Sequence, residues 1–171
     1  MTFEWEKYQT DLPSVSDADL DFVEAKRRVN LPKGYRETVK QHCGDIPVLG
    51  VARVGIGSTP VSALFFVRYD YQGPRPILNM WYWIKEIEGY KETEGYKETE
   101  GYYDSDTAGK FVPFASNSSH GIYAFDYRKG SNPAVAFLDL ETALYDVENS
   151  IFPVAESWED FLASLTDGDD D

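Results

Sequence analysis

The sequence predicts an α+β fold, with a mainly antiparallel sheet of about six strands packed against N-terminal helices and a C-terminal helix. Two observations carry this prediction. Apolar residues recur at helical spacing near both ends of the chain and at a spacing close to two between them. The middle segments are rich in β-branched and aromatic residues and are separated by Gly and Pro, as consecutive antiparallel strands are.

Two helices are expected near the N-terminus. Ser16 is suited to cap the first helix, and the basic residues 26–28 fall in its last turn, where cations interact favourably with the helix dipole. Pro32 is suited to the start of the second helix, and Gly44 to the position just past its end. The second helix would bury Val39 and Cys43, four residues apart.

Six runs of residues are expected to be strands. They are Val48–Val54, Val61–Tyr71, Ile77–Ile84, Phe111–Ala115, Ile122–Tyr127 and Ala134–Leu140. The stretch Gly55–Pro60 is interpreted as a hairpin turn. In the third run, Trp81 and Trp83 would lie on one face of the sheet and Tyr82 on the other.

A last helix is expected to begin at Ser157, with Asp160 in the capping-box position. Its apolar stripe has the i, i+3, i+4, i+7 spacing of a docked amphipathic helix and consists of Trp158, Phe161, Leu162 and Leu165. We therefore predict one domain over residues 1–166, followed by an acidic tail at 167–171.

A tandem repeat interrupts this pattern, as an insertion at about 86–106. The hexapeptide EGYKET occupies 88–93 and again 94–99, and EGY follows at 100–102. From 88 to 106 there are seven carboxylates and two lysines, a net charge of −5. Such a segment cannot bury much apolar surface, so it is expected to be an exposed acidic arm. Because six is an even number, the repeat keeps the same residues on the same face of a strand, which favours a β-ribbon over a helix.

The charge balance limits the classes of molecule that this chain is expected to bind. With 16 Lys and Arg against 30 Asp and Glu, the net charge of −14 argues against direct contact with nucleic acid or an anionic membrane. It favours a basic partner, or simply high solubility. One cysteine, Cys43, excludes an intrachain disulfide, and neither a signal peptide nor an apolar run of membrane-spanning length is evident. The expectation is a cytoplasmic protein.

Candidate chemistry is weak everywhere. Ser118, Ser119 and His120 lie in a stretch of ordinary turn composition, and adjacent side chains rarely form a nucleophile with its base. His42 and Cys43 would form a thiolate pair only if the fold apposed them, and neighbours on a helix point about 100° apart. The two histidines and one cysteine lack zinc-site spacing, and Asp104 and Asp106 lack the Gly and the distal Glu of a calcium loop. We therefore expect no catalytic, cofactor-binding or metal-binding residues and no enzymatic activity.

An ordered set of motifs does form a pattern. It consists of LPKGY at 31–35, HCG at 42–44, VPFA at 112–115, GIYAFD at 121–126, PAVAF at 133–137 and VAESWEDFL at 154–162. Together these resemble the SUKH superfamily, which includes bacterial immunity proteins and fungal regulators of cell-wall synthesis. The resemblance spans about Asp17 to Leu165. Two features depart from it, namely His42–Cys43, where a polar residue such as Asn is usual before the glycine, and the hexapeptide tandem.

The resemblance implies a non-enzymatic domain that binds and neutralises a toxin, commonly a nuclease, encoded beside it. A basic, nuclease-like toxin would suit the acidic charge; the alternative is an intracellular interaction or regulatory module of the same fold. Motif residues are expected to be structural, with Pro32, Tyr35 and Gly44 shaping the helices and Phe114, Tyr123, Phe125, Phe137 and Phe161 in the core. The candidate partner-binding residues are Glu88, Tyr90, Glu92, Glu94, Tyr96, Glu98, Glu100, Tyr102, Asp104 and Asp106, and Tyr103 is expected to add to their surface. The arm could equally be a tolerated loop extension, since loop growth costs little.

Overall fold

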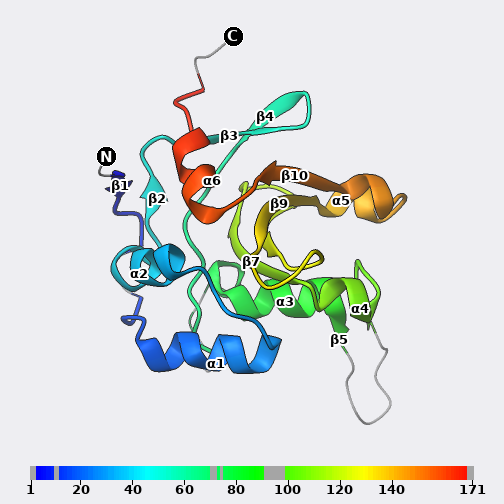
Figure 1. The fold of residues 1–171 in the computed structure, drawn as a ribbon, viewed down its shortest axis with the longest axis horizontal. Coiled ribbons are helices and arrows are strands. Elements are labelled where there is room, and N and C mark those ends of the chain that lie inside the picture. The colour runs from blue at the N-terminus through cyan, green and yellow to red at the C-terminus, as the bar shows by residue number, and fades with distance from the viewer. Residues whose placement is uncertain (1–2, 10–11, 70–72, 74, 91–98, 169–171) are drawn as a thin grey trace.

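A four-stranded antiparallel sheet with helices around it forms the centre of the molecule (Figure 1). The computed structural model describes residues 3–9, 12–69, 73, 75–90 and 99–168. The helices are α1 (Asp17–Arg27), α2 (Lys33–His42), η1 (Pro76–Leu78), α3 (Met80–Glu88), α4 (Ser105–Ala108), α5 (Leu140–Ala143), η2 (Glu148–Ser150) and α6 (Trp158–Ser164). The strands are β1 (Trp5–Glu6), β2 (Ile46–Pro47), β3 (Val51–Val54), β4 (Gly57–Pro60), β5 (Gly89–Tyr90), β6 (Thr99–Glu100), β7 (Phe111–Ser116), β8 (Gly121–Asp126), β9 (Ala134–Asp139) and β10 (Ile151–Ala155).

The α+β class is confirmed, but the main sheet is smaller than predicted. Its order is β10-β9-β8-β7, and the other described strands form the two-stranded ladders β1-β2, β3-β4 and β5-β6. The last three predicted strands correspond to β7, β8 and β9. The edge strand β10 was not predicted; it contains Pro153, and its pairing with β9 shifts register beyond that residue. Proline is tolerated there because an edge strand has one unpaired side.

The predicted helix ends are confirmed. The Ser16 hydroxyl accepts the Asp19 N–H while the Asp19 carboxylate accepts the Ser16 N–H, which completes a capping box. Ser157 caps α6 by accepting the Asp160 N–H at 3.0 Å. Gly44, just past α2, has φ +82°, a conformation that a residue with a Cβ would adopt only under strain.

The predicted strand Ile77–Ile84 is wrong. This segment begins in η1 and continues into α3, whose Asn79 cap accepts the Trp81 N–H at 2.7 Å. Met80, Ile84 and Ile87 are buried on one side of α3, so the true period is helical. The alternation of Trp, Tyr and Trp imitates a strand, although Trp81 is buried and its neighbours at 82 and 83 are both half-buried.

Two further strand predictions are corrected. Residues 61–67 are almost entirely buried, yet they pair through isolated bridges at Leu64 and Phe66 rather than as a regular strand. The predicted Val48–Val54 strand is shortened to β3. The predicted turn Gly55–Pro60 is shortened to Gly55–Ile56, because Gly57–Pro60 forms β4 and pairs antiparallel with β3. The part of the second predicted strand at 70–71 lies outside the described residues.

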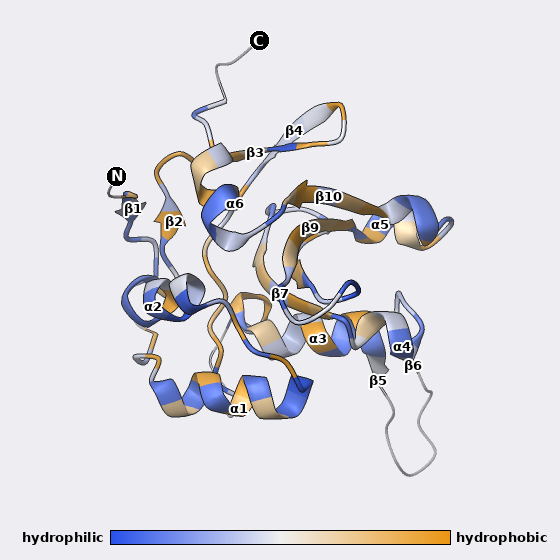
Figure 2. Cartoon of the chain, viewed as in Figure 1, coloured by the Kyte–Doolittle hydropathy of each residue, from blue (hydrophilic) through white to orange (hydrophobic). Residues whose placement is uncertain are grey.

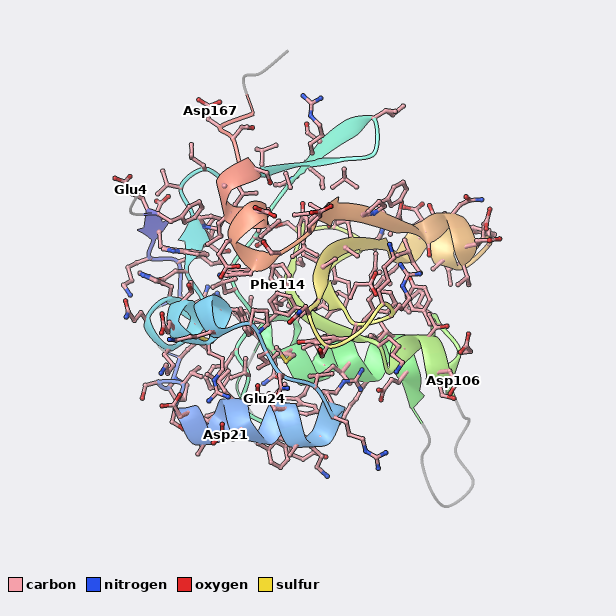
Figure 3. The ribbon with its side chains drawn as sticks, viewed as in Figure 1. Glu4, Asp21, Glu24, Asp106, Phe114 and Asp167 are labelled. Atoms are coloured by element: carbon pink, nitrogen blue, oxygen red, sulfur yellow. The ribbon has the colours of Figure 1, made fainter. Side chains whose placement is uncertain are left out.

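The aromatic core gathers where α2, α6 and the sheet meet. The Phe114 ring lies 4.7 Å from Phe125, 5.3 Å from Trp158 and 5.4 Å from Phe161, measured between centroids. Tyr35 reaches the same cluster from α2, with its ring 5.4 Å from that of Trp158. The strands of the sheet are coloured as largely hydrophobic, whereas much of α1 is hydrophilic (Figure 2). Phe114 lies centrally, and the labelled acids Asp21, Asp106 and Asp167 lie at the periphery (Figure 3).

Candidate protein-binding surface

The repeat arm, residues 88–106, begins as a β-ribbon. β5 and β6 pair antiparallel, with Gly89 opposite Glu100 and Tyr90 opposite Thr99. This ladder confirms the ribbon prediction at the base of the arm. Four of the candidate residues, Glu92, Glu94, Tyr96 and Glu98, lie outside the described residues, and for Tyr90 and Glu100 only the backbone is described.

The first and last copies of EGY, at 88–90 and 100–102, form the base of the arm. Gly89 ends α3 with φ +88°, and its N–H donates to the Lys85 carbonyl. Gly101 passes so close to α3 that a Cβ there would lie 2.3 Å from the carbonyl carbon of Glu88. The Tyr103 N–H then donates to the Ile87 carbonyl at 3.2 Å. Glycine at these two repeat positions is therefore required by the backbone, independently of any partner.

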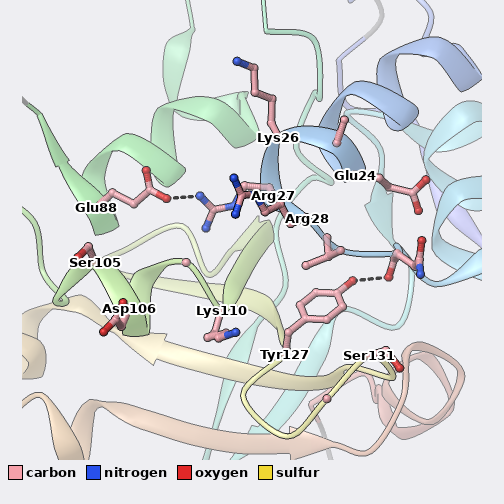
Figure 4. Close-up of a pocket in the computed structure, with 15 residues that line it drawn as sticks. Glu24, Lys26, Arg27, Arg28, Glu88, Ser105, Asp106, Lys110, Tyr127 and Ser131 are labelled. Carbon is pink, nitrogen blue, oxygen red and sulfur yellow. Dashed lines mark hydrogen bonds and ion pairs between the residues drawn. The ribbon is translucent and has the colours of Figure 1, made fainter.

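Arg27 ties the arm to α1. Its side chain is only 7% exposed, and one amino group donates to the carbonyls of Ala108 and Phe111 at 2.8 and 2.9 Å. The other amino group forms an ion pair with Glu88 (Figure 4). Glu88, a candidate for partner contact, is thus already engaged in holding α1 and α3 together. Its carboxylate remains partly accessible.

The acids at the end of the arm differ in what they do. Asp104 caps α4, where its carboxylate accepts the Thr107 N–H and hydroxyl, both at 2.9 Å. These hydrogen bonds lower the pKa of Asp104 below its ordinary value. Asp106 is exposed in the first turn of α4, and Tyr102 is half-buried against the core. The candidate residues of the arm therefore include structural caps as well as exposed acids.

Tyr103 does not belong to the surface that the sequence suggests. It is 4% exposed and its hydroxyl lies 3.0 Å from the Ser150 hydroxyl oxygen. Burial raises the pKa of Tyr103. The expected surface contribution of this residue is therefore wrong, because its ring packs near that of Phe111 in the core and its hydroxyl bonds to Ser150.

A groove of about 900 Å³ lies beside the base of the arm (Figure 4). Exposed cations from three positions line it, namely Lys26, Arg28 and Lys110. Glu24 and Asp106 line the same groove. The groove therefore carries both signs of charge and does not extend the acidic surface predicted for the arm.

The residues considered for chemistry have structural surroundings. Asn117 holds the turn before β8, its side-chain oxygen accepting the N–H groups of Ser119 and Gly121 at 3.0 Å. His120 is exposed and lies 3.6 Å from Glu141. Burial raises the pKa of the Cys43 thiol to about 12, so the thiolate required of a nucleophile is disfavoured at neutral pH.

Within the described ranges, no group of three or more His, Cys, Asp or Glu side chains could hold a metal ion. In the same part of the chain, no helix is both long and apolar enough to cross a membrane.

Comparison with known families identifies the chain. The model of the SMI1 / KNR4 family (SUKH-1) matches residues 14–164. The chain belongs to this family. No curated protein matches it significantly. The SUKH-1 assignment confirms the resemblance seen in the motifs, and it is consistent with an immunity-protein type of role.

In this SUKH-1 domain the motif residues are structural, as expected. The five predicted core aromatics are all buried: Phe114, Tyr123, Phe125, Phe137 and Phe161. Pro32 occupies the cap position of α2, and a Cβ at Gly121 would lie 2.0 Å from the Phe137 ring. Because the five aromatics face the interior, their side chains are unavailable for contact with a partner.

Proposed function

We propose that this SUKH-1 domain is an immunity protein that binds and neutralises a cognate protein toxin. The toxin would be basic and nuclease-like, and would be encoded beside this chain. The observation that carries the proposal is the combination of SUKH-1 membership with a net charge of −14. A nuclease needs a cationic cleft for phosphates, and a strongly acidic protein can cover such a cleft.

Neutralisation would operate by occlusion, without chemistry on the part of this chain. Carboxylates would lie where substrate phosphates bind, and the opposite net charges would accelerate the encounter. We also propose that residues 1–166 act as one domain in the cytoplasm, with the repeat arm as an insertion and 167–171 as a tail.

Co-expression tests this proposal. The toxin from the neighbouring reading frame should arrest growth of a host cell, and this chain should restore growth. Calorimetry with a catalytically inactivated toxin should give a one-to-one complex whose affinity falls steeply as salt rises. Absence of both protection and binding would contradict the immunity role. Stable complexes with several host proteins, and none with the toxin, would favour the regulatory alternative.

A further inference from the structure

The segment 139–150, which we call the α5 loop, is held in a fixed conformation by its own side chains. Asp139 caps α5, its carboxylate accepting the Thr142 N–H at 3.2 Å and the Thr142 hydroxyl at 3.0 Å. Asp146 accepts the Asn149 N–H at 3.3 Å and the Asn149 amide group at 2.6 Å. Capping at both ends leaves the loop little conformational freedom to lose when it binds.

The core also anchors this loop. Leu140 and Ala143 are buried, and Ser150 is completely enclosed. The Ser150 hydroxyl donates to the Val147 carbonyl at 2.6 Å, so the hydroxyl of Tyr103 is the donor in the 3.0 Å contact between these two side chains. The exposed part of the loop is therefore mounted on a packed base.

Large apolar side chains nevertheless project from the α5 loop into solvent. Leu144 is 65% exposed, Tyr145 is 89% exposed and Val147 is also exposed. The whole of the α5 loop, residues 139–150, lies within the described part of the chain. Clustered apolar exposure on a rigid loop is typical of an interaction surface, and tyrosine is a frequent interface anchor.

A recess of about 410 Å³ adjoins this loop. Ile56, Phe152, His120 and Glu141 are among the residues that line it. Ile56 is fully exposed at the tip of the β3–β4 hairpin, where Gly55 supplies the positive φ of the two-residue turn. Glu141, which lines the recess, belongs to α5, and Leu144 follows directly after that helix.

The sequence that contains the α5 loop is one-sided in charge, while His120 lines the adjoining recess. Residues 130–171 contain eleven carboxylates and no Lys, Arg or His, although they make up only a quarter of the chain. The α5 loop alone contributes four carboxylates, at Asp139, Glu141, Asp146 and Glu148. The groove beside the repeat arm, by contrast, includes exposed cations.

We propose that the α5 loop and the tip of the β3–β4 hairpin form the docking surface for a basic protein. The partner places a Lys or Arg side chain in the recess beside Glu141 and packs apolar surface against Ile56, Leu144 and Tyr145. This inference rests on the proposed function and assigns its contact surface to residues outside the repeat arm. A second copy of this chain is a poorer occupant, because it would bring two acidic loops together.

The test measures binding of the catalytically inactivated toxin from the adjacent reading frame. The double substitution Leu144→Ser/Tyr145→Ser should raise the dissociation constant by about 30-fold or more, as expected on losing two anchors. Ile56→Ser, at a hairpin tip with no packing to lose, should weaken binding by about 5-fold or more.

The matched control is Leu49→Ser/Tyr8→Ser, which replaces the same residue types at exposed positions elsewhere. It should change the dissociation constant by less than about 3-fold. Circular dichroism should show all variants folded.

Three outcomes overturn the inference, and they can be distinguished. If the wild type binds the toxin and both the α5-loop and the hairpin variants bind it equally well, this surface is not the docking surface, and the immunity role still stands. Absence of wild-type binding removes both proposals. A wild-type dimer in analytical ultracentrifugation that Leu144→Ser/Tyr145→Ser abolishes would assign the surface to a second copy.

Discussion

The repeat arm and the α5 loop are both acidic and both contain tyrosine, and the described base of the arm (β5 and α4) lies at the same end of the molecule as α5 (Figure 1). They differ in how their tyrosines are placed. Tyr103, at the end of the arm, is buried, whereas Tyr145, on the loop, is almost fully exposed. A hydrogen bond between Tyr103 and Ser150 joins the two regions. Among the described residues, the two regions share an acidic composition and differ in how far a tyrosine side chain is exposed.

The largest expected effect separates these two tyrosines. Tyr103→Ala should lower the free energy of unfolding by about 3–5 kcal/mol, because it empties a buried aromatic site and removes the bond to Ser150. Tyr145→Ala should change it by less than about 0.5 kcal/mol, because that ring is exposed. Urea denaturation of both variants measures the difference. Equal losses of stability would mean that the two regions are not distinguished by packing.

A smaller effect is expected at the base of the arm. Arg27→Ala should cost about 2–3 kcal/mol of unfolding free energy, since it leaves the carbonyls of Ala108 and Phe111 without their donor. Lys26→Ala, the exposed neighbour, is the control and should stay within about 0.5 kcal/mol. The folded Arg27 variant should still bind the toxin like wild type. Reduced toxin binding by a fully folded Arg27 variant would instead include the base of the arm in the interface.

Removing one hexapeptide tests the arm more directly. Deletion of 94–99 leaves a single EGYKET followed by EGY, so the same residue types remain available for the β5–β6 ladder. Stability should change by no more than about 1 kcal/mol, because loop-closure entropy depends weakly on length. Toxin affinity, measured by calorimetry, should stay within about 3-fold of wild type. A tenfold loss would transfer the docking surface to the arm.

The smallest effect concerns two aspartate caps, one in each region. Hydrogen bonds from Thr107 lower the pKa of Asp104, and those from Asn149 lower the pKa of Asp146, from the ordinary value of 3.8. Because the folded pKa is depressed, each cap contributes stability above pH 3.8 and loses it as the pH falls through the folded pKa. Carboxyl NMR titration should give midpoints below 3.8 for both. A midpoint at or above that value would show that the cap is not formed in solution.

Prediction from sequence succeeded where local chemistry decides the structure. The caps at Ser16 and Ser157 fix the starts of two helices through contacts within a few residues. The short, nearly continuous apolar runs of β7, β8 and β9 indicate buried strands. Prediction from sequence failed at α3. A helix was indicated there by Asn79 as a cap and by the helical spacing of Met80, Ile84 and Ile87. The tryptophans at 81 and 83 outweighed that signal because aromatic alternation also indicates a strand.

The candidate site was less predictable than the fold. The arm attracts attention because its repeat is visible in the sequence, whereas the α5 loop is short and ordinary in composition. Its exposure follows from the caps at Asp139 and Asp146 and from the burial of Ser150, which together determine which side chains point outward. No sequence period reports such an arrangement.

The sequence by itself determined the family and the buried aromatic set around Phe114 through its ordered motifs, and it determined the α+β class and the acidic charge through local spacing, capping and composition. Only the tertiary structure decided which tyrosine is exposed. Tyr103 is buried and its hydroxyl bonds to a residue 47 positions away in the chain, while Tyr145 is 89% exposed. Burial depends on contacts between distant segments, so identical side chains acquire different roles only when the chain is folded.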